Sequence, residues 1–127
     1  MDPQQEIFTE LLIKLREKGY RVFDGSIAPE DAKYPFICMG ESQQADDQNK
    51  TSVFGTVYQT LHVWHNDMRK RGELSGILLA IKQICRRLEQ TKNFDWIVKD
   101  VDQRILIDTT TNTPLLHGVL NITYKFS

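Results

Sequence analysis

Apolar residues recur along this chain with two different spacings, and the wider spacing predicts two helices. From Gln4 to Lys18 the apolar side chains return every three or four residues, which places them on one face of a helix. Asp2 is a suitable N-cap residue, Pro3 suits the first helical position, and Gly19 suits the left-handed residue that ends a helix. A second run with the same spacing, from Leu74 to Leu88, predicts a second helix.

The other apolar runs are rich in β-branched and aromatic residues, and they predict five strands. The clearest alternation lies in the last run, where every second residue from Leu120 to Phe126 is apolar, as in an antiparallel strand with one face in water. The run from Val53 to His65 is expected to form the longest strand. Gly40 predicts a bend or bulge, and the slipped phase at residues 100–103 predicts another. The five strand ranges are 20–23, 34–40, 53–65, 96–107 and 115–126.

The order of these elements predicts the fold class. Two helices and five strands follow the order α-β-β-β-α-β-β, and the turn-rich residues 108–114 predict a hairpin between the last two strands. We therefore predict an α+β fold, with an antiparallel or mixed sheet of about five strands and both helices packed on one face. No repeat or linker divides the sequence, so residues 1–127 are expected to form a single domain.

The most polar stretch of the chain is residues 41–52, ESQQADDQNKTS, in which Ala45 is the only apolar residue. We interpret it as a loop between two strands. The loop either faces solvent, or it is a tongue that becomes ordered against a partner. In the second case the backbone amides of residues 41–52 should exchange fast in the free protein.

Charge and composition narrow the classes of function. Sixteen basic side chains against seventeen acidic ones give a net charge of −1, so no overall positive field attracts the chain to nucleic acid or to an anionic membrane. The first residues lack the positive charge and apolar run of a secretory signal, and no stretch approaches the ~18 apolar residues of a membrane span. The expected location is therefore the cytoplasm of the cell that makes the protein.

Three histidines and two cysteines are the candidates for chemistry. Among His62, His65 and His117 there is no HxxxH or HExxH spacing, and the first two fall on opposite faces of one strand, so we expect no metal site. Cys38 and Cys85 form no CxxC pair and are interpreted as buried apolar residues. No nucleophile or phosphate-binding motif is present, so no catalytic residue and no cofactor is expected. One alternative stays open: a small enzyme or ligand-binding module that uses Cys38, His62 or His117 in a pocket formed only by the fold.

Two basic segments raise the question of phosphate binding. Acidic residues flank both Arg69-Lys70-Arg71 and Arg86-Arg87, and no exposed aromatic platform is interleaved with them for stacking bases. A solvated charged surface is the simpler interpretation. A nucleic-acid-binding accessory protein is the second alternative.

Several short motifs keep a characteristic order along the chain. They are Tyr34-Pro35 before a strand, His62 to Trp64 at the end of the long strand, the helix GELSGILLAIKQICRRL, and His117-Gly118 at the start of the last strand. In this order and spacing, over about residues 5–126, the chain resembles the tail-completion proteins of long-tailed phages, which are similar in fold to the tail terminators. It departs from them at the hairpin turn, where DTTTNTP replaces a short DPDG-like turn.

The resemblance implies a non-enzymatic structural protein of the virion. Such a protein forms a homo-oligomeric ring, a hexamer, at the head-proximal end of the tail, where it completes the tail and joins it to the head. The implied partners are further copies of the chain, the tail tube protein and a head–tail connector or stopper protein. No membrane is involved, and DNA is touched only passively as it crosses the ring lumen. The protein is expected in the virion, at the head–tail interface, and in the host cytoplasm during assembly.

Charged and polar segments are the candidate interface. The opposite signs of Arg69-Lys70-Arg71 and Asp46-Asp47 prompt the hypothesis that the basic segment of one subunit meets the acidic segment of a neighbour. With the polar segment and the hairpin tip, the full set of candidate interface residues is Gln43, Gln44, Asp46, Asp47, Gln48, Asn49, Lys50, Arg69, Lys70, Arg71, Thr110, Thr111 and Asn112.

Overall fold

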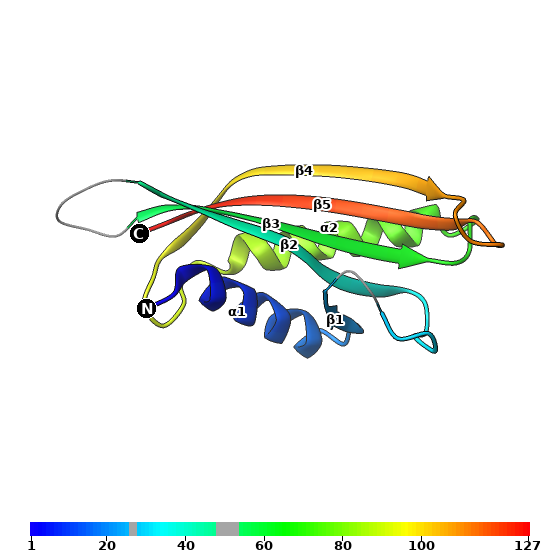
Figure 1. Cartoon of the computed structure of the whole chain (residues 1–127), viewed down its shortest axis with the longest axis horizontal. Helices are drawn as coiled ribbons and strands as arrows, with labels where there is room; N and C mark the ends of the chain where they lie inside the picture. The colour runs from blue at the N-terminus through cyan, green and yellow to red at the C-terminus, as the bar shows by residue number, and fades with distance from the viewer. Residues whose placement is uncertain (26–27, 48–53) are drawn as a thin grey trace.

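The computed structural model describes residues 1–25, 28–47 and 54–127, and its elements are labelled in Figure 1. The chain order is the predicted one, so the predicted fold class is confirmed. The longest strand is β4, with 13 residues, rather than β3, with 12. The elements are α1 (Pro3–Glu17), β1 (Val22–Asp24), β2 (Phe36–Asp47), β3 (Phe54–His65), α2 (Arg71–Arg87), β4 (Trp96–Asp108) and β5 (Leu115–Phe126).

The five strands form one mixed sheet in the order β1-β2-β3-β5-β4. The short β1 runs parallel to β2, and the other four strands alternate in direction. Both predicted irregularities are present: the β2–β3 register shifts between Met39 and Ser42, and the β4–β5 register shifts between Val98 and Asp100. The second shift lies just before the predicted residues 100–103.

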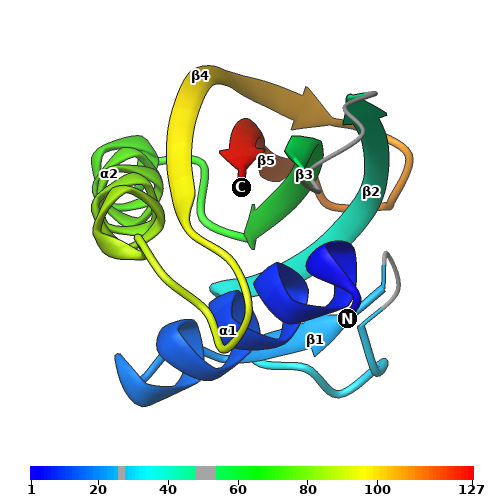
Figure 2. The ribbon, with the colours of Figure 1, turned by 90° about the vertical axis from the view of Figure 1, so that its left-hand side faces the viewer.

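Both helices pack on the same face of the sheet, and Figure 2 shows α1 beside β1 and β2, with α2 beside β4. The apolar stripe of α1 is buried, as is that of α2, and together with the inward side chains of β3 and β5 they form the core. Gly118 allows α2 to approach β5, because a Cβ there would lie 3.1 Å from Leu78 Cδ1. The buried Tyr124 hydroxyl donates a hydrogen bond of 2.9 Å to the Cys85 carbonyl oxygen at the end of α2.

The predicted boundaries of α1 are confirmed by its capping contacts. The Asp2 carboxylate accepts a hydrogen bond of 3.1 Å from the Gln5 amide, and Pro3 occupies the first helical position. Gly19, directly after the C-cap residue, has a φ of 95°, which lies in the left-handed region.

The prediction of a loop at residues 41–52 is wrong for residues 41–47, which continue β2. These residues pair with β3, with Gln43 opposite Tyr58 and Asp47 opposite Phe54. The N-terminus of α1 also holds them, because the Gln4 amide donates to Gln44 Oε1 over 3.1 Å. A polar sequence with weak strand propensity therefore becomes a strand because its neighbour supplies a pairing edge. Gln48, Asn49 and Lys50 lie outside the described residues.

This pairing changes the expected hydrogen exchange. In an edge strand only the amides directed at the neighbouring strand are protected, so we expect slow exchange at every second amide from Ser42 to Asp47 in the free protein. Residue-resolved exchange measured by NMR tests this expectation. Uniformly fast exchange from Ser42 to Asp47 would contradict the strand and restore the mobile loop.

Candidate assembly surfaces

The face of the sheet turned away from the helices carries a stacked cluster of two imidazoles and an indole. His62 Nδ1 lies 2.8 Å from His117 Nε2, within hydrogen-bond distance. The rings of Trp64 and His117 are parallel, with an interplanar angle of 8° and centroids 3.8 Å apart. The register of β3 against β5 makes the cluster, because it places Trp64 directly opposite His117.

The environment of the imidazoles keeps them neutral near pH 7. Burial, together with the neighbouring His62, lowers the pKa of His117 to about 4, against the opposing effect of Asp108. Burial also lowers the pKa of His62. A hydrogen bond between two imidazoles needs one ring nitrogen to donate and the other to accept, so the pair requires at least one neutral ring.

Cys38, the third residue of the enzyme alternative, lies next to this cluster, because β2 pairs Cys38 opposite His62. The thiol is fully buried, and burial raises its pKa, so it stays protonated. Among the described residues no hydrogen bond joins the thiol to either imidazole. Cys38, His62 and His117 therefore lie on the same face of the sheet. Their burial favours a protonated thiol and neutral imidazoles, so neither a thiolate nor a charged imidazole is present near pH 7. Within the same residues, no group of three or more His, Cys, Asp and Glu side chains could hold a metal ion.

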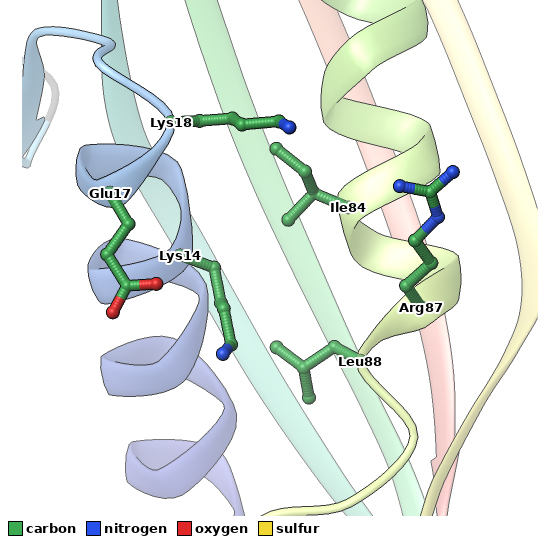
Figure 3. A pocket seen from close by; sticks show the side chains of 6 residues that line it. All are labelled: Lys14, Glu17, Lys18, Ile84, Arg87 and Leu88. Carbon is green, nitrogen blue, oxygen red and sulfur yellow. The ribbon is translucent and has the colours of Figure 1, made fainter.

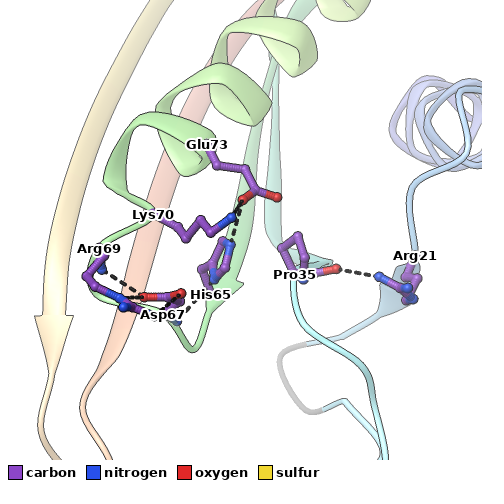
Figure 4. Close-up of polar contacts among 7 residues, drawn as sticks. All are labelled: Arg21, Pro35, His65, Asp67, Arg69, Lys70 and Glu73. Carbon is purple, nitrogen blue, oxygen red and sulfur yellow. Dashed lines mark hydrogen bonds and ion pairs between the residues drawn. The ribbon is translucent and has the colours of Figure 1, made fainter.

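In the connection from β3 to α2, two of the three residues of the predicted basic segment, Arg69 and Lys70, contact carboxylates of the same chain. Figure 4 shows the Asp67 carboxylate accepting hydrogen bonds from the Arg69 backbone amide, at 3.0 Å, and from its guanidinium, at 3.2 Å. Hydrogen bonds from Arg69 lower the pKa of Asp67. Lys70 Nζ lies 3.8 Å from Glu73 Oε2, and the carboxylate of Glu73 also lies 3.3 Å from His65 Nε2. Arg71 begins α2 and makes no ion pair within the described part of the chain.

At the tip of the β4–β5 hairpin, polar side chains bond to one another. The Asp108 carboxylate accepts hydrogen bonds from the Thr110 amide, at 2.8 Å, and from its hydroxyl, at 2.6 Å. The Thr111 hydroxyl donates to the Thr113 carbonyl oxygen over 2.5 Å. Thr110, Thr111 and Asn112 are all exposed, so the tip is a polar projection that a partner can reach.

The predicted interface residues that the structure describes fall into two groups at opposite ends of the long strands. The hairpin tip and the β3–α2 connection share one end, since Leu116, near the start of β5, pairs with His65 at the end of β3. Asp46 lies at the other end, opposite Gly55. The stretch of β3 from Gly55 to His65 separates these ends by about 30 Å. Contact between Arg69-Lys70-Arg71 and Asp46-Asp47 of a neighbour stays a prediction, and it requires subunits offset along the strand direction.

A groove separates the C-terminal halves of the two helices, and Figure 3 shows it lined by side chains from both. Its volume is about 420 Å³. Ile84 and Leu88 supply its apolar part, while Lys14, Lys18 and Arg87 place three positive charges around it against the single carboxylate of Glu17. No motif in the sequence indicates this groove, because it forms only where the two helices come together. No described helix is both long and apolar enough to cross a bilayer.

The comparison with solved structures finds this fold in a chain of a gene transfer agent virion. A chain of the "Virion of native gene transfer agent (GTA) particle" superposes with a TM-score of 0.62, over 97% of this chain and 94% of that chain. The two sequences are 12% identical, so the likeness shows a shared fold. No protein-family model and no curated protein matches the sequence.

Proposed function

We propose that this chain is a non-enzymatic structural protein of a phage-like virion. It forms a hexameric ring at the head-proximal end of the tail, completes the tail and joins it to the head connector or stopper. The observation that carries the proposal is the fold shared with a chain of a gene transfer agent virion over nearly the whole length of both chains. The order of motifs that resembles tail-completion proteins supports it independently of the structure.

The chemistry of the described residues agrees with a role played by surfaces. The cluster of Cys38, His62 and His117 contains a protonated thiol and neutral imidazoles, and it lacks an activated nucleophile. Polar residues are exposed at both ends of the long strands, as contacts with a tail tube at one end and a connector at the other would require; they include Gln43, Asp46 and Asp47 at one end and Thr110, Thr111 and Asn112 at the other.

The proposal is tested by measuring the mass of the purified chain alone and after mixing with tail tubes assembled from the tube protein of the same genome. We expect the chain to bind one end of each tube as a closed ring, visible by electron microscopy and with a mass of six subunits. A chain that stays monomeric and never binds tubes would contradict the proposal. Retention on DNA that falls steeply with salt, without tube binding, would favour the nucleic-acid-binding alternative.

A further inference from the structure

The charges of this chain are divided between two regions of the fold. Residues 22–47, which form β1, β2 and their connection, contain six acidic side chains and one basic side chain. Residues 66–92, which contain α2, carry seven basic side chains and three acidic ones. The net charge of the whole chain is near zero because an acidic region and a basic region largely cancel.

The acidic region lies at one edge of the sheet, and the basic region packs on β3, β5 and β4, in the half of the sheet that ends in the other edge. β1 and the exposed part of β2 form one edge, which we name the acidic edge, and Asp24, Glu41, Asp46 and Asp47 lie on it. The other edge strand is β4, and Figure 2 shows α2 beside it, on the far side of the molecule from β1. The charges are therefore separated across the sheet, from one edge strand toward the other. Neighbouring subunits of a ring meet in this direction when the strands run along the ring axis.

On α2 the charge forms a stripe on the side away from α1. Ile84 and Leu88 face α1 across the groove of Figure 3, so the opposite flank of the helix borders β4. That flank carries residues spaced three or four apart, which are Arg71, Ser75, Leu79, Lys82 and Arg86. None of its three cations makes an ion pair within the described residues, and the Leu79 side chain among them is 51% exposed. We name this flank of α2 the basic side. The neighbouring edge strand β4 carries both signs, with Lys99 and Arg104 beside Asp100, Asp102 and Asp108.

Both edges also carry unpaired backbone. Within the described part of the chain, β4 pairs with β5 on one side only, and its Ile97 and Ile107 are 67% and 57% exposed. From Ser42 to Asp47, β2 pairs with β3 and with no other described strand. Long unpaired edges with exposed apolar residues are sites where a strand from another chain can add.

Strand direction makes the two edges compatible. The strands β2, β3, β5 and β4 alternate in direction, so β2 and β4 run antiparallel. When one copy is placed beside another by a rotation about an axis along the strands, β2 of the second copy meets β4 of the first in the antiparallel sense. The alternation of the sheet then continues from one subunit to the next.

We propose that copies of this chain join side to side, with the acidic edge of one copy on the basic side of the next and Ser42–Asp47 of β2 lying along β4. This inference rests on the proposed ring and names the surfaces that close it. In this arrangement Asp46 is level with Trp96 at the start of β4, because Asp46 pairs with Gly55, Gly55 with Phe126 and Phe126 with Trp96. Arg86 lies at the same end of the sheet, since the neighbouring Cys85 carbonyl accepts a hydrogen bond from Tyr124, and Lys82 is one helical turn before it. The basic side therefore offers opposite charge to Asp46 and Asp47. This arrangement does not use Arg69 and Lys70, because they follow the His65 end of β3 while Asp46 lies at the Gly55 end.

A charge swap tests the proposal. The variant Asp46→Lys/Asp47→Lys has two positive surfaces, and the variant Lys82→Glu/Arg86→Glu has two negative ones. We expect each alone to lose at least tenfold in self-association at low salt, on tail tubes and in solution, because like charges meet at every interface. An equimolar mixture should regain assembly in which the variants alternate. Native mass spectrometry, with one variant isotope-labelled, measures both results.

The matched control is Lys14→Glu/Lys18→Glu, which makes the same change of net charge on the groove between the helices and should assemble like the wild type. All variants change side chains on the surface, so circular dichroism should show the wild-type fold. Wild-type assembly by Lys82→Glu/Arg86→Glu, or a mixture that fails to assemble, would overturn the assigned surfaces while leaving the ring intact. A wild-type chain that never associates would instead overturn the proposed function, and this inference with it.

Discussion

Replacing Gly55 by alanine is expected to lower the free energy of unfolding by about 2–3 kcal/mol, the upper part of the range for overpacking. A Cβ on Gly55 would lie 2.4 Å from the Ala45 carbonyl oxygen, and 3.0 Å from both Asp46 Cα and Phe126 Cζ. Two of these three atoms belong to the backbone of β2, which pairs with β3 at this point and cannot move as the end of a flexible side chain can. Urea unfolding followed by circular dichroism measures the loss.

Gly76→Ala is the matched control, because a Cβ there meets no atom within 4 Å and the residue lies inside α2. Alanine in the interior of a helix is favoured over glycine by about 1 kcal/mol, so this variant should be more stable than the wild type. Equal changes in the two variants would show that the close approach of β2 to Gly55 is absent in solution. The Gly55→Ala variant should also lose the slow amide exchange from Ser42 to Asp47, because its effect is centred on that pairing.

Local sequence signals were sufficient for the helices and for most strands. The period of apolar residues and the Asp2-Pro3 start identify α1 without any tertiary information, and the glycine that follows it has the expected left-handed φ. Residues 41–47 could not be identified in this way. Their composition is that of a loop, and they are extended because β3 and the N-terminus of α1 supply hydrogen-bonding partners from elsewhere in the chain.

The candidate surfaces were less predictable than the fold. The alternation in the two strands places His62 and His117 on the polar face, yet 55 residues separate them, and only the register of β3 against β5 brings the rings together. The separation of acidic and basic residues also depends on the tertiary fold. The acidic and basic segments can be counted along the sequence, but only the order β1-β2-β3-β5-β4 and the packing of α2 on β3, β5 and β4 place them in opposite halves of the sheet.

Lowering the pH from 6.5 to 4 is expected to remove about 2 kcal/mol of stability through His117 alone. Its pKa falls from the ordinary 6.5 to about 4 in the folded chain. One pKa unit corresponds to about 1.4 kcal/mol, and the expected loss is smaller than the full shift would produce, because the ring is only partly buried and solvent screens the charge. The shift of His62 is in the same direction, so the two rings act together.

The direction of the pH effect on stability follows from whether the folded or the unfolded chain binds a proton at His117 more readily. Above pH 6.5 the imidazole is neutral in both the folded and the unfolded chain, and the full stability is present. Between pH 6.5 and pH 4 the unfolded chain takes up a proton at His117 while the folded chain does not, so unfolding becomes more favourable as the pH falls. Below pH 4 His117 is protonated in both the folded and the unfolded chain, so this contribution to the pH dependence ends.

The matched variant is His117→Gln, whose amide does not titrate but can still hydrogen-bond to His62. Urea unfolding at half-unit steps from pH 7 to pH 4 should show a smaller loss of stability for the variant than for the wild type. Asp108 loses its own contribution mainly at lower pH, because hydrogen bonds from Thr110 lower its pKa, and it is present in both proteins. An NMR titration that placed the pKa of His117 near 6.5, or parallel losses in both proteins, would show that the ring is solvated in solution. The stacked cluster on the open face would then not persist in water.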